Sequence, residues 1–120
     1  MDIRLLSKIC WDWGVRCFGI DHMCDQEVRS LRAAEEMIEL NQALGVDPAK
    51  LHLLIETVYS RPQGKVHQEF GGVLVTLLVL AERIQLDIEV CLEDEVHRIL
   101  SKSPEHFAKR NQEKLDMGLT

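Results

Sequence analysis

The segment 65–84 is the part of the chain that most restricts the possible folds. Its valines and its Gly71-Gly72 pair lower helix propensity, so a buried strand at 73–80 is a possible alternative. The length decides against a strand, because about twenty residues without a turn signal exceed a usual one. The apolar residues also keep helical spacing: Val66, Phe70, Val73, Leu74, Leu77, Leu78 and Ala81. We therefore predict a buried central helix whose glycines let a neighbouring segment approach closely.

The rest of the chain is typical of helices separated by short turns. Apolar spacing predicts helices over 3–18, 25–44, 47–58 and 87–100, and Ser103-Pro104 opens a short charged helix that ends near residue 117. We expect loops at 19–24 and 59–64, N-caps at Asp25 and Asp47, and a buried side of the second helix at Leu31, Ala34, Ile38 and Ala43. No strand pairing and no internal repeat is evident. The predicted fold class is therefore all-α.

Length and charge limit the possible partners. A chain of 120 residues with 46% apolar residues is expected to form one globular domain, 1–120. The formal charge of −6 argues against a nucleic-acid partner, because phosphate backbones bind basic patches. The longest uncharged apolar run, 70–81, is too short to cross a bilayer, and the first residues lack a signal-peptide pattern. We expect a cytoplasmic protein that binds neither nucleic acid nor membrane.

The four cysteines do not form a metal-binding motif. Cys10, Cys17 and Cys24 recur every seven residues, which on a helix is one stripe. Zinc sites normally contain a close pair of cysteines, and this sequence has none. We therefore expect buried free thiols in a reducing compartment.

Three carboxylates crowd a little more than one turn of the second predicted helix. Glu35 and Glu39 are four residues apart, and Glu36 and Glu39 are three apart, so all can lie on one side. Like charges at these spacings repel, and a solvated acidic face is the alternative interpretation. Glu69 begins the later apolar segment that we expect to lie beside this helix. Converging carboxylates from two helices would favour Mg²⁺ or Mn²⁺.

These motifs, in this order, resemble the MazG-like superfamily of all-α nucleoside triphosphate pyrophosphohydrolases, especially its phage-type members, which are related to dimeric dUTPases. The family signature is Glu-x-x-Glu on one helix and Glu-x-x-Asp on a later one. Here the first half is the segment 35–40 and the second half is the segment 68–77. The resemblance implies a four-helix-bundle core with additional short helices that oligomerises. In one departure, Gly72 stands where the family has Asp.

The resemblance implies a metal-dependent hydrolase. A nucleoside triphosphate would be cut between its α and β phosphates, with Mg²⁺ or Mn²⁺ as cofactor. Glu36, Glu39 and Glu69 would bind the metal. Glu35 would be a further ligand or the base that orients water, so Glu35 and Glu36 are the expected catalytic residues. Water, substrate oxygens, Asp94 or Glu95 would compensate for Gly72.

Cationic and aromatic side chains would bind the substrate. The expected substrate-binding residues are Trp13, Arg32, Arg61 and Lys65, and Lys109, Arg110 and Lys114 are further candidates for the phosphates. Each residue has an ordinary alternative. Arg32 would instead form an ion pair with Glu35 or Glu36, and Trp13 would be part of the core.

The helices are too few and too apolar to complete a core alone. We therefore expect a homodimer or homotetramer whose partner covers the segment 73–80. Because Gly72 removes one expected metal ligand, a different function stays open: a catalytically degenerate helical interaction module.

Overall fold

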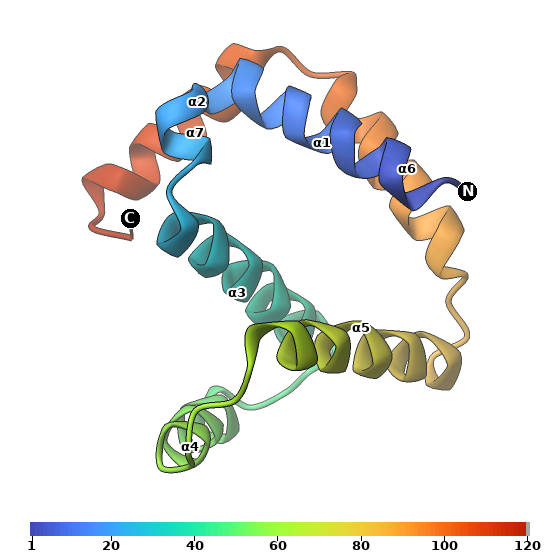
Figure 1. Cartoon of the computed structure of the whole chain (residues 1–120), viewed down its shortest axis with the longest axis vertical. Helices are drawn as coiled ribbons and strands as arrows, with labels where there is room; N and C mark the ends of the chain where they lie inside the picture. Colours follow the sequence, from blue (N-terminus) through green and yellow to red (C-terminus); the bar gives the residue numbers. More distant parts are fainter. Residues whose placement is uncertain (120) are drawn as a thin grey trace. The chain divides into compact units, whose positions relative to one another are not determined.

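The structure is a computed structural model that describes residues 1–119. In this range it contains seven α-helices and no strand, which confirms the all-α prediction (Figure 1). The helices are α1 (Ile3–Phe18), α2 (Ile20–Met23), α3 (Gln26–Ala43), α4 (Pro48–Tyr59), α5 (Val66–Arg83), α6 (Ile88–Leu100) and α7 (Pro104–Asp116). Across residues 1–119, no helix has both the length and the apolar character needed to cross a membrane.

Side-chain caps set several of the helix starts. The Asp25 carboxylate accepts a hydrogen bond from Val28 N at 3.2 Å, and Asp47 accepts one from Ala49 N at 2.9 Å. Each cap satisfies an amide that has no partner inside its helix. Both predicted N-caps are therefore confirmed, and α4 follows with Pro48 at its start.

The predicted loop at 19–24 is wrong, because α2 lies inside it. Met23 of α2 is only 7% exposed, and its side chain occupies the space where a Cβ on the buried Gly14 of α1 would stand. The missing Cβ thus lets a short helix lie close against α1. This contact depends on Gly14 and Met23 meeting in space, which local sequence signals do not show.

The structure also contains a repeat that the sequence analysis missed. Helices α3 and α5 both have 18 residues and begin forty residues apart, and α4 and α6 begin forty apart as well. The turns after α3 and α5 share the same backbone hydrogen bonds, from Val46 N to Asn41 O at 3.0 Å and from Leu86 N to Ala81 O at 2.9 Å. The spacing of the helix starts and the hydrogen bond of this turn therefore occur twice in the chain.

The described chain divides into two compact units. Unit 1 contains Met1–Glu35 and the chain from Glu89 onward, and unit 2 is Glu36–Ile88. In unit 1, α1 packs against α7 and α2. Its buried apolar side chains are Cys17, Met23, Val28 and Val96.

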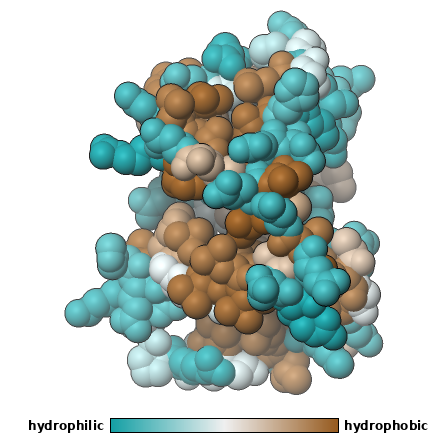
Figure 2. All heavy atoms as spheres, turned by 90° about the vertical axis from the view of Figure 1, so that its right-hand side faces the viewer, coloured by the Kyte–Doolittle hydropathy of each residue, from teal (hydrophilic) through white to brown (hydrophobic). Residues whose placement is uncertain are grey.

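Unit 2 has no buried residue at all. The prediction that 65–84 is helical is confirmed, but the prediction that this helix is buried is wrong within the single chain, since α5 has no buried residue. Phe70 is 66% exposed and Val73 is 50% exposed. Figure 2 shows hydrophobic side chains uncovered on one face of the molecule.

Two further burial predictions fail. Leu31, Ala34, Ile38 and Ala43, the expected buried side of α3, are all exposed, and Val28 is the buried residue of that helix. The cysteines are free, as expected, but Cys24 and Cys91 are exposed. Helical spacing finds the apolar side of a helix, whereas burial also needs a neighbouring element to cover it.

Candidate functional site

The acidic stretch of α3 is divided between the two units, because the boundary falls between Glu35 and Glu36. In unit 1, the Lys114 ammonium of α7 donates a hydrogen bond to Glu35 Oε1. Arg32 Nη1 lies 3.7 Å from Glu35 Oε2. Glu35 therefore lies between two cations. The Arg32–Glu35 ion pair is the alternative to phosphate binding that the sequence analysis gives for Arg32.

A second polar contact joins the same two helices. Arg32 Nη2 donates a hydrogen bond to Asn111 Oδ1 at 2.7 Å. This bond and the Lys114–Glu35 bond both join residues 79 apart in the sequence, so α3 and α7 run in the same direction along this contact. Asn111 is not among the predicted site residues, and no local sequence signal identifies its contact with a residue 79 positions away.

The three predicted metal ligands all belong to unit 2. Glu36 and Glu39 lie three residues apart on the last half of α3, and Glu69 lies in the first turn of α5. All three are exposed. Their carboxylate oxygens suit a hard divalent cation such as Mg²⁺.

The Glu69 carboxylate turns back toward Gly64, just before α5. A Cβ at Gly64 would meet the Glu69 carboxylate, and it would also stand 3.2 Å from Glu69 Cγ. The φ angle of Gly64 is not in the left-handed region, so its backbone does not demand glycine. Glycine here provides space for Glu69. The exposed Arg61 and Lys65 lie in the same short connection.

The structure does not assemble these carboxylates into one group. Among residues 1–119, no three His, Cys, Asp or Glu side chains come close enough together to hold a metal ion. The three predicted ligands therefore have suitable carboxylate oxygens and belong to one unit. That they come together around a metal ion stays a prediction.

The position of Gly72 has room for a side chain. A Cβ built there meets nothing within 4 Å. Of the candidates to compensate for the missing Asp, Glu95 is already bound to Arg98, with Oε1 and Nη2 2.5 Å apart. The hydrogen bond from Arg98 lowers the pKa of Glu95, while burial opposes this shift. Glu95 therefore has a partner within its own helix.

Trp13 lies in an aromatic cluster of unit 1. Its ring meets Phe107 of α7 edge-on at 5.0 Å between centroids and Phe18 at 5.7 Å. The side chain is half-buried and joins α1 to α7. This contact matches the core role given as the alternative for Trp13, and its role in binding a base stays a prediction.

Phe18 is surrounded by nitrogen-bearing side chains. Trp13 and His22 meet its ring edge-on, and the Arg29 guanidinium lies 5.6 Å from its centroid. Trp13 Nε1, His22 Nε2, Arg29 Nε and Arg29 Nη2 are buried without a hydrogen-bond partner among residues 1–119. Burial lowers the pKa of Arg29, the charge of Arg32 acts in the same direction, and Asp25 opposes both.

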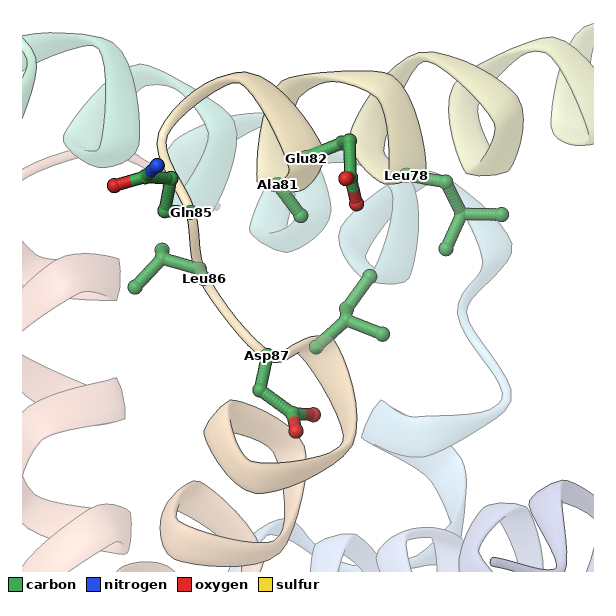
Figure 3. A pocket seen from close by; sticks show the side chains of 7 residues that line it. Leu78, Ala81, Glu82, Gln85, Leu86 and Asp87 are labelled. Carbon is green, nitrogen blue, oxygen red and sulfur yellow. The ribbon is translucent and has the colours of Figure 1, made fainter.

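A shallow hollow of about 470 Å³ lies at the end of α5 and contains none of the predicted site residues. Its lining residues are Leu78, Ala81, Glu82, Gln85, Leu86, Asp87 and Ile88. Figure 3 shows that the side chains of Gln85 and Asp87 point in different directions. Because its polar groups do not converge, this hollow is a poor candidate for chemistry.

Comparison with known proteins adds no relative. No protein-family model, no curated protein and no solved structure matches the chain. The resemblance to MazG-like enzymes therefore depends on the motifs around Glu36, Glu39 and Glu69.

Proposed function

We propose that this protein is a MazG-like, metal-dependent nucleoside triphosphate pyrophosphohydrolase. It would cut a nucleoside triphosphate between the α and β phosphates, giving a monophosphate and pyrophosphate, with Mg²⁺ or Mn²⁺ as cofactor. One structural observation supports the proposal most. Glu36, Glu39 and Glu69 come from two helices of an all-α chain and fall within one compact unit.

The carboxylates have distinct proposed roles. Glu36, Glu39 and Glu69 hold the metal, which when bound neutralises phosphate charge. Glu35, which is ion-paired with Lys114 and Arg32 in unit 1, is a further ligand or the base that orients the attacking water. The space at Gly64 lets the Glu69 carboxylate lie beside the connection that carries the proposed phosphate-binding cations.

Arg61 and Lys65 are the proposed phosphate-binding cations of unit 2. Both are exposed and near Glu69 in the sequence, so a metal-bound phosphate would meet them together. Arg32 and Trp13 belong to unit 1, where both already have partners.

The proposed functional form is a homodimer or homotetramer with a MazG-like four-helix core. The support is the packing of unit 2, in which no residue is buried although sixteen of its large apolar side chains are more than 40% exposed. A folded unit requires apolar surface to be covered, and the single chain leaves this surface open.

A nucleotide panel tests the activity. We expect pyrophosphate release from at least one canonical or modified (d)NTP with Mg²⁺ or Mn²⁺. Glu36→Gln and Glu39→Gln should each reduce turnover by about 100-fold or more, because each removes a charge that the metal needs. Glu56→Gln, on exposed α4, is the matched control and should leave turnover unchanged.

Circular dichroism checks that the variants fold, and unchanged helicity is expected since Glu36 and Glu39 are exposed. Full activity in both variants would show that the site is assigned wrongly. Absence of pyrophosphate release across the whole panel would contradict the hydrolase proposal itself.

The second candidate function is a helical interaction module without turnover. It is favoured by Gly72 in place of the family Asp and by the exposed apolar side chains of unit 2. Titration with Mn²⁺ separates the two functions. The hydrolase requires binding that weakens in Glu39→Gln, whereas an interaction module has no reason to bind Mn²⁺ there.

A further inference from the structure

Four buried side-chain nitrogens of unit 1 have no hydrogen-bond partner among residues 1–119. They are Trp13 Nε1 on α1, His22 Nε2 on α2, and Arg29 Nε and Nη2 on α3. Buried polar atoms in folded proteins nearly always have a partner, because an unpaired one loses its bonds to water without replacement. Four such atoms on three successive helices therefore indicate a place where a hydrogen-bond acceptor would bind.

The side chains that carry these nitrogens surround one aromatic ring. Measured from the centroid of the Phe18 ring, the Trp13 ring lies at 5.7 Å, the His22 ring at 5.8 Å and the Arg29 guanidinium carbon at 5.6 Å. The Phe18 ring carries no oxygen or nitrogen, so it holds the three side chains together without accepting an ordinary hydrogen bond from them. We call Trp13, Phe18, His22 and Arg29 the Phe18 cluster.

The two unpaired nitrogens of Arg29 form one edge of its guanidinium group. The N–H bonds of Nε and Nη2 point in parallel from this edge and match two oxygens of a carboxylate or a phosphate. Arg98 uses the same edge in this protein: its Nε lies 3.0 Å from Glu95 Oε2, and its Nη2 donates a hydrogen bond to Glu95 Oε1. Arg29 therefore presents the donor pair of a bidentate oxyanion contact.

The positive charge of Arg29 is also uncompensated. Within residues 1–119, no carboxylate forms an ion pair with it. Burial lowers the pKa of Arg29, and the charge of Arg32 acts in the same direction. Asp25 opposes both effects from a distance, but its carboxylate accepts a hydrogen bond from Val28 N. An anion would compensate this charge, whereas a water molecule would only accept a hydrogen bond.

We propose that unit 1 binds a small oxyanion, a phosphate or a carboxylate group, at the Phe18 cluster. The Arg29 edge donates two hydrogen bonds to the oxyanion, and Trp13 Nε1 and His22 Nε2 donate one each. An ionised oxyanion only accepts hydrogen bonds, so it is complementary to a cluster of donors. The three donor side chains are half-buried, so the cluster lies next to the surface and small side-chain movements open it to the ligand.

This site is independent of the proposed hydrolase. The cluster belongs to unit 1, whereas the proposed metal ligands Glu36, Glu39 and Glu69 belong to unit 2. The test of the site uses neither a nucleotide nor a metal ion, and it does not require a base to bind at Trp13. Anion binding by an inactive protein would contradict only the hydrolase, and an active protein that binds no anion here would contradict only this site.

Nuclear magnetic resonance of the isotope-labelled protein tests the site directly. Sodium phosphate and sodium acetate are titrated separately, with sodium chloride at equal ionic strength as the reference. We expect one of the two oxyanions, or both, to shift the Trp13 Nε1–H and Arg29 Nε–H resonances saturably, since both protons would gain an acceptor. Trp11, which is 42% exposed and outside the cluster, is the internal control, and its indole resonance should not shift. The anion with the lower dissociation constant shows whether the site prefers phosphate or carboxylate.

Matched arginine substitutions test which side chain binds the anion. Arg29→Met removes the guanidinium edge but keeps a long side chain, and it should raise the dissociation constant of the anion by about 100-fold or more. Arg16→Met, at an exposed position of α1 in the same unit, makes the same change in net charge and should alter this constant less than about threefold. The Trp13 resonance reports binding in both variants, and circular dichroism checks their folding.

A second substitution in the cluster decides the question if Arg29→Met fails to fold. Trp13→Phe removes one donor but keeps an aromatic ring beside Phe18 and Phe107. It should raise the dissociation constant by about tenfold, measured from the Arg29 Nε–H resonance.

Two results would overturn the proposal. One is the absence of a saturable shift with either oxyanion, which would mean that ordered water alone satisfies these nitrogens. The other is an equal weakening of binding by Arg16→Met and Arg29→Met, which would indicate a general attraction of anions to unit 1 instead of a site at the Phe18 cluster.

Discussion

At Gly72, where the MazG-like signature would have Asp, helix α5 has an open position. A Cβ meets nothing within 4 Å at Gly72 or at Gly71, and neither glycine has a left-handed φ. Backbone strain therefore does not require glycine at either site. This separates them from Gly64, where the Glu69 carboxylate occupies the place of a Cβ.

Replacing Gly72 by Asp should strengthen metal binding. The change restores Glu-x-x-Asp with Glu69 and adds one carboxylate to the proposed ligand set. We expect the affinity for Mn²⁺ to rise by about tenfold or more, measured by calorimetric titration. Gly71→Asp is the control, since it adds the same charge about 100° away around the helix and should give a smaller gain. Equal gains in the two variants would indicate general attraction of cations.

At the scale of elements, one of the similar turns contains a residue with an unfavourable backbone conformation. The turns after α3 and α7 place Gly45 and Gly118 in the left-handed region, with φ of 81° and 75°. The matching turn after α5 places Gln85 there, with φ of 58°. A side chain in this region is disfavoured by about 1 kcal/mol or more, so the second repeat is closed by a less suitable residue than the first.

Gln85→Gly should therefore stabilise the protein. We expect the free energy of unfolding to rise by about 1 kcal/mol, after allowance for the greater flexibility of glycine in the unfolded chain. Urea denaturation followed by circular dichroism measures this. The reciprocal variant Gly45→Gln should lose a similar amount. A destabilised Gln85→Gly protein would show that the Gln85 side chain makes contacts worth more than the backbone strain.

At the scale of the whole molecule, the two units differ in how many side chains they bury. Unit 1 has an internal core at Cys17, Met23, Val28 and Val96. Unit 2 has no buried residue, and in the proposed oligomer a second copy would cover its apolar side chains. A hydrophobic face that is covered only by association gives protection that depends on protein concentration.

Hydrogen–deuterium exchange at several dilutions should reveal this difference. On about hundredfold dilution, the amides of α4 and α5 should exchange faster, while those of α1 should keep their protection. Mass spectrometry of peptides from α1 serves as the internal control in the same sample. Equal protection of α5 at all concentrations would show that its stability does not come from association.

The sequence by itself determined the helices and many of their ends. Apolar spacing predicted a helix at 65–84 in spite of its valines and glycines, and Asp25 and Asp47 predicted where α3 and α4 begin. These features are local, since helix spacing and capping involve residues within one or two turns. The acidic motif of Glu35, Glu36 and Glu39 could be recognised for the same reason, because its residues lie within little more than one helical turn.

Only the tertiary structure decided which of these faces are covered and which charges are paired. Met23 fills the space left by Gly14, Lys114 binds Glu35 from 79 residues away, and α5 has no buried residue although its sequence is that of a buried helix. Each outcome depends on distant segments meeting in space. Spacing along one helix identifies an apolar or acidic side, but it does not identify the element that lies against that side.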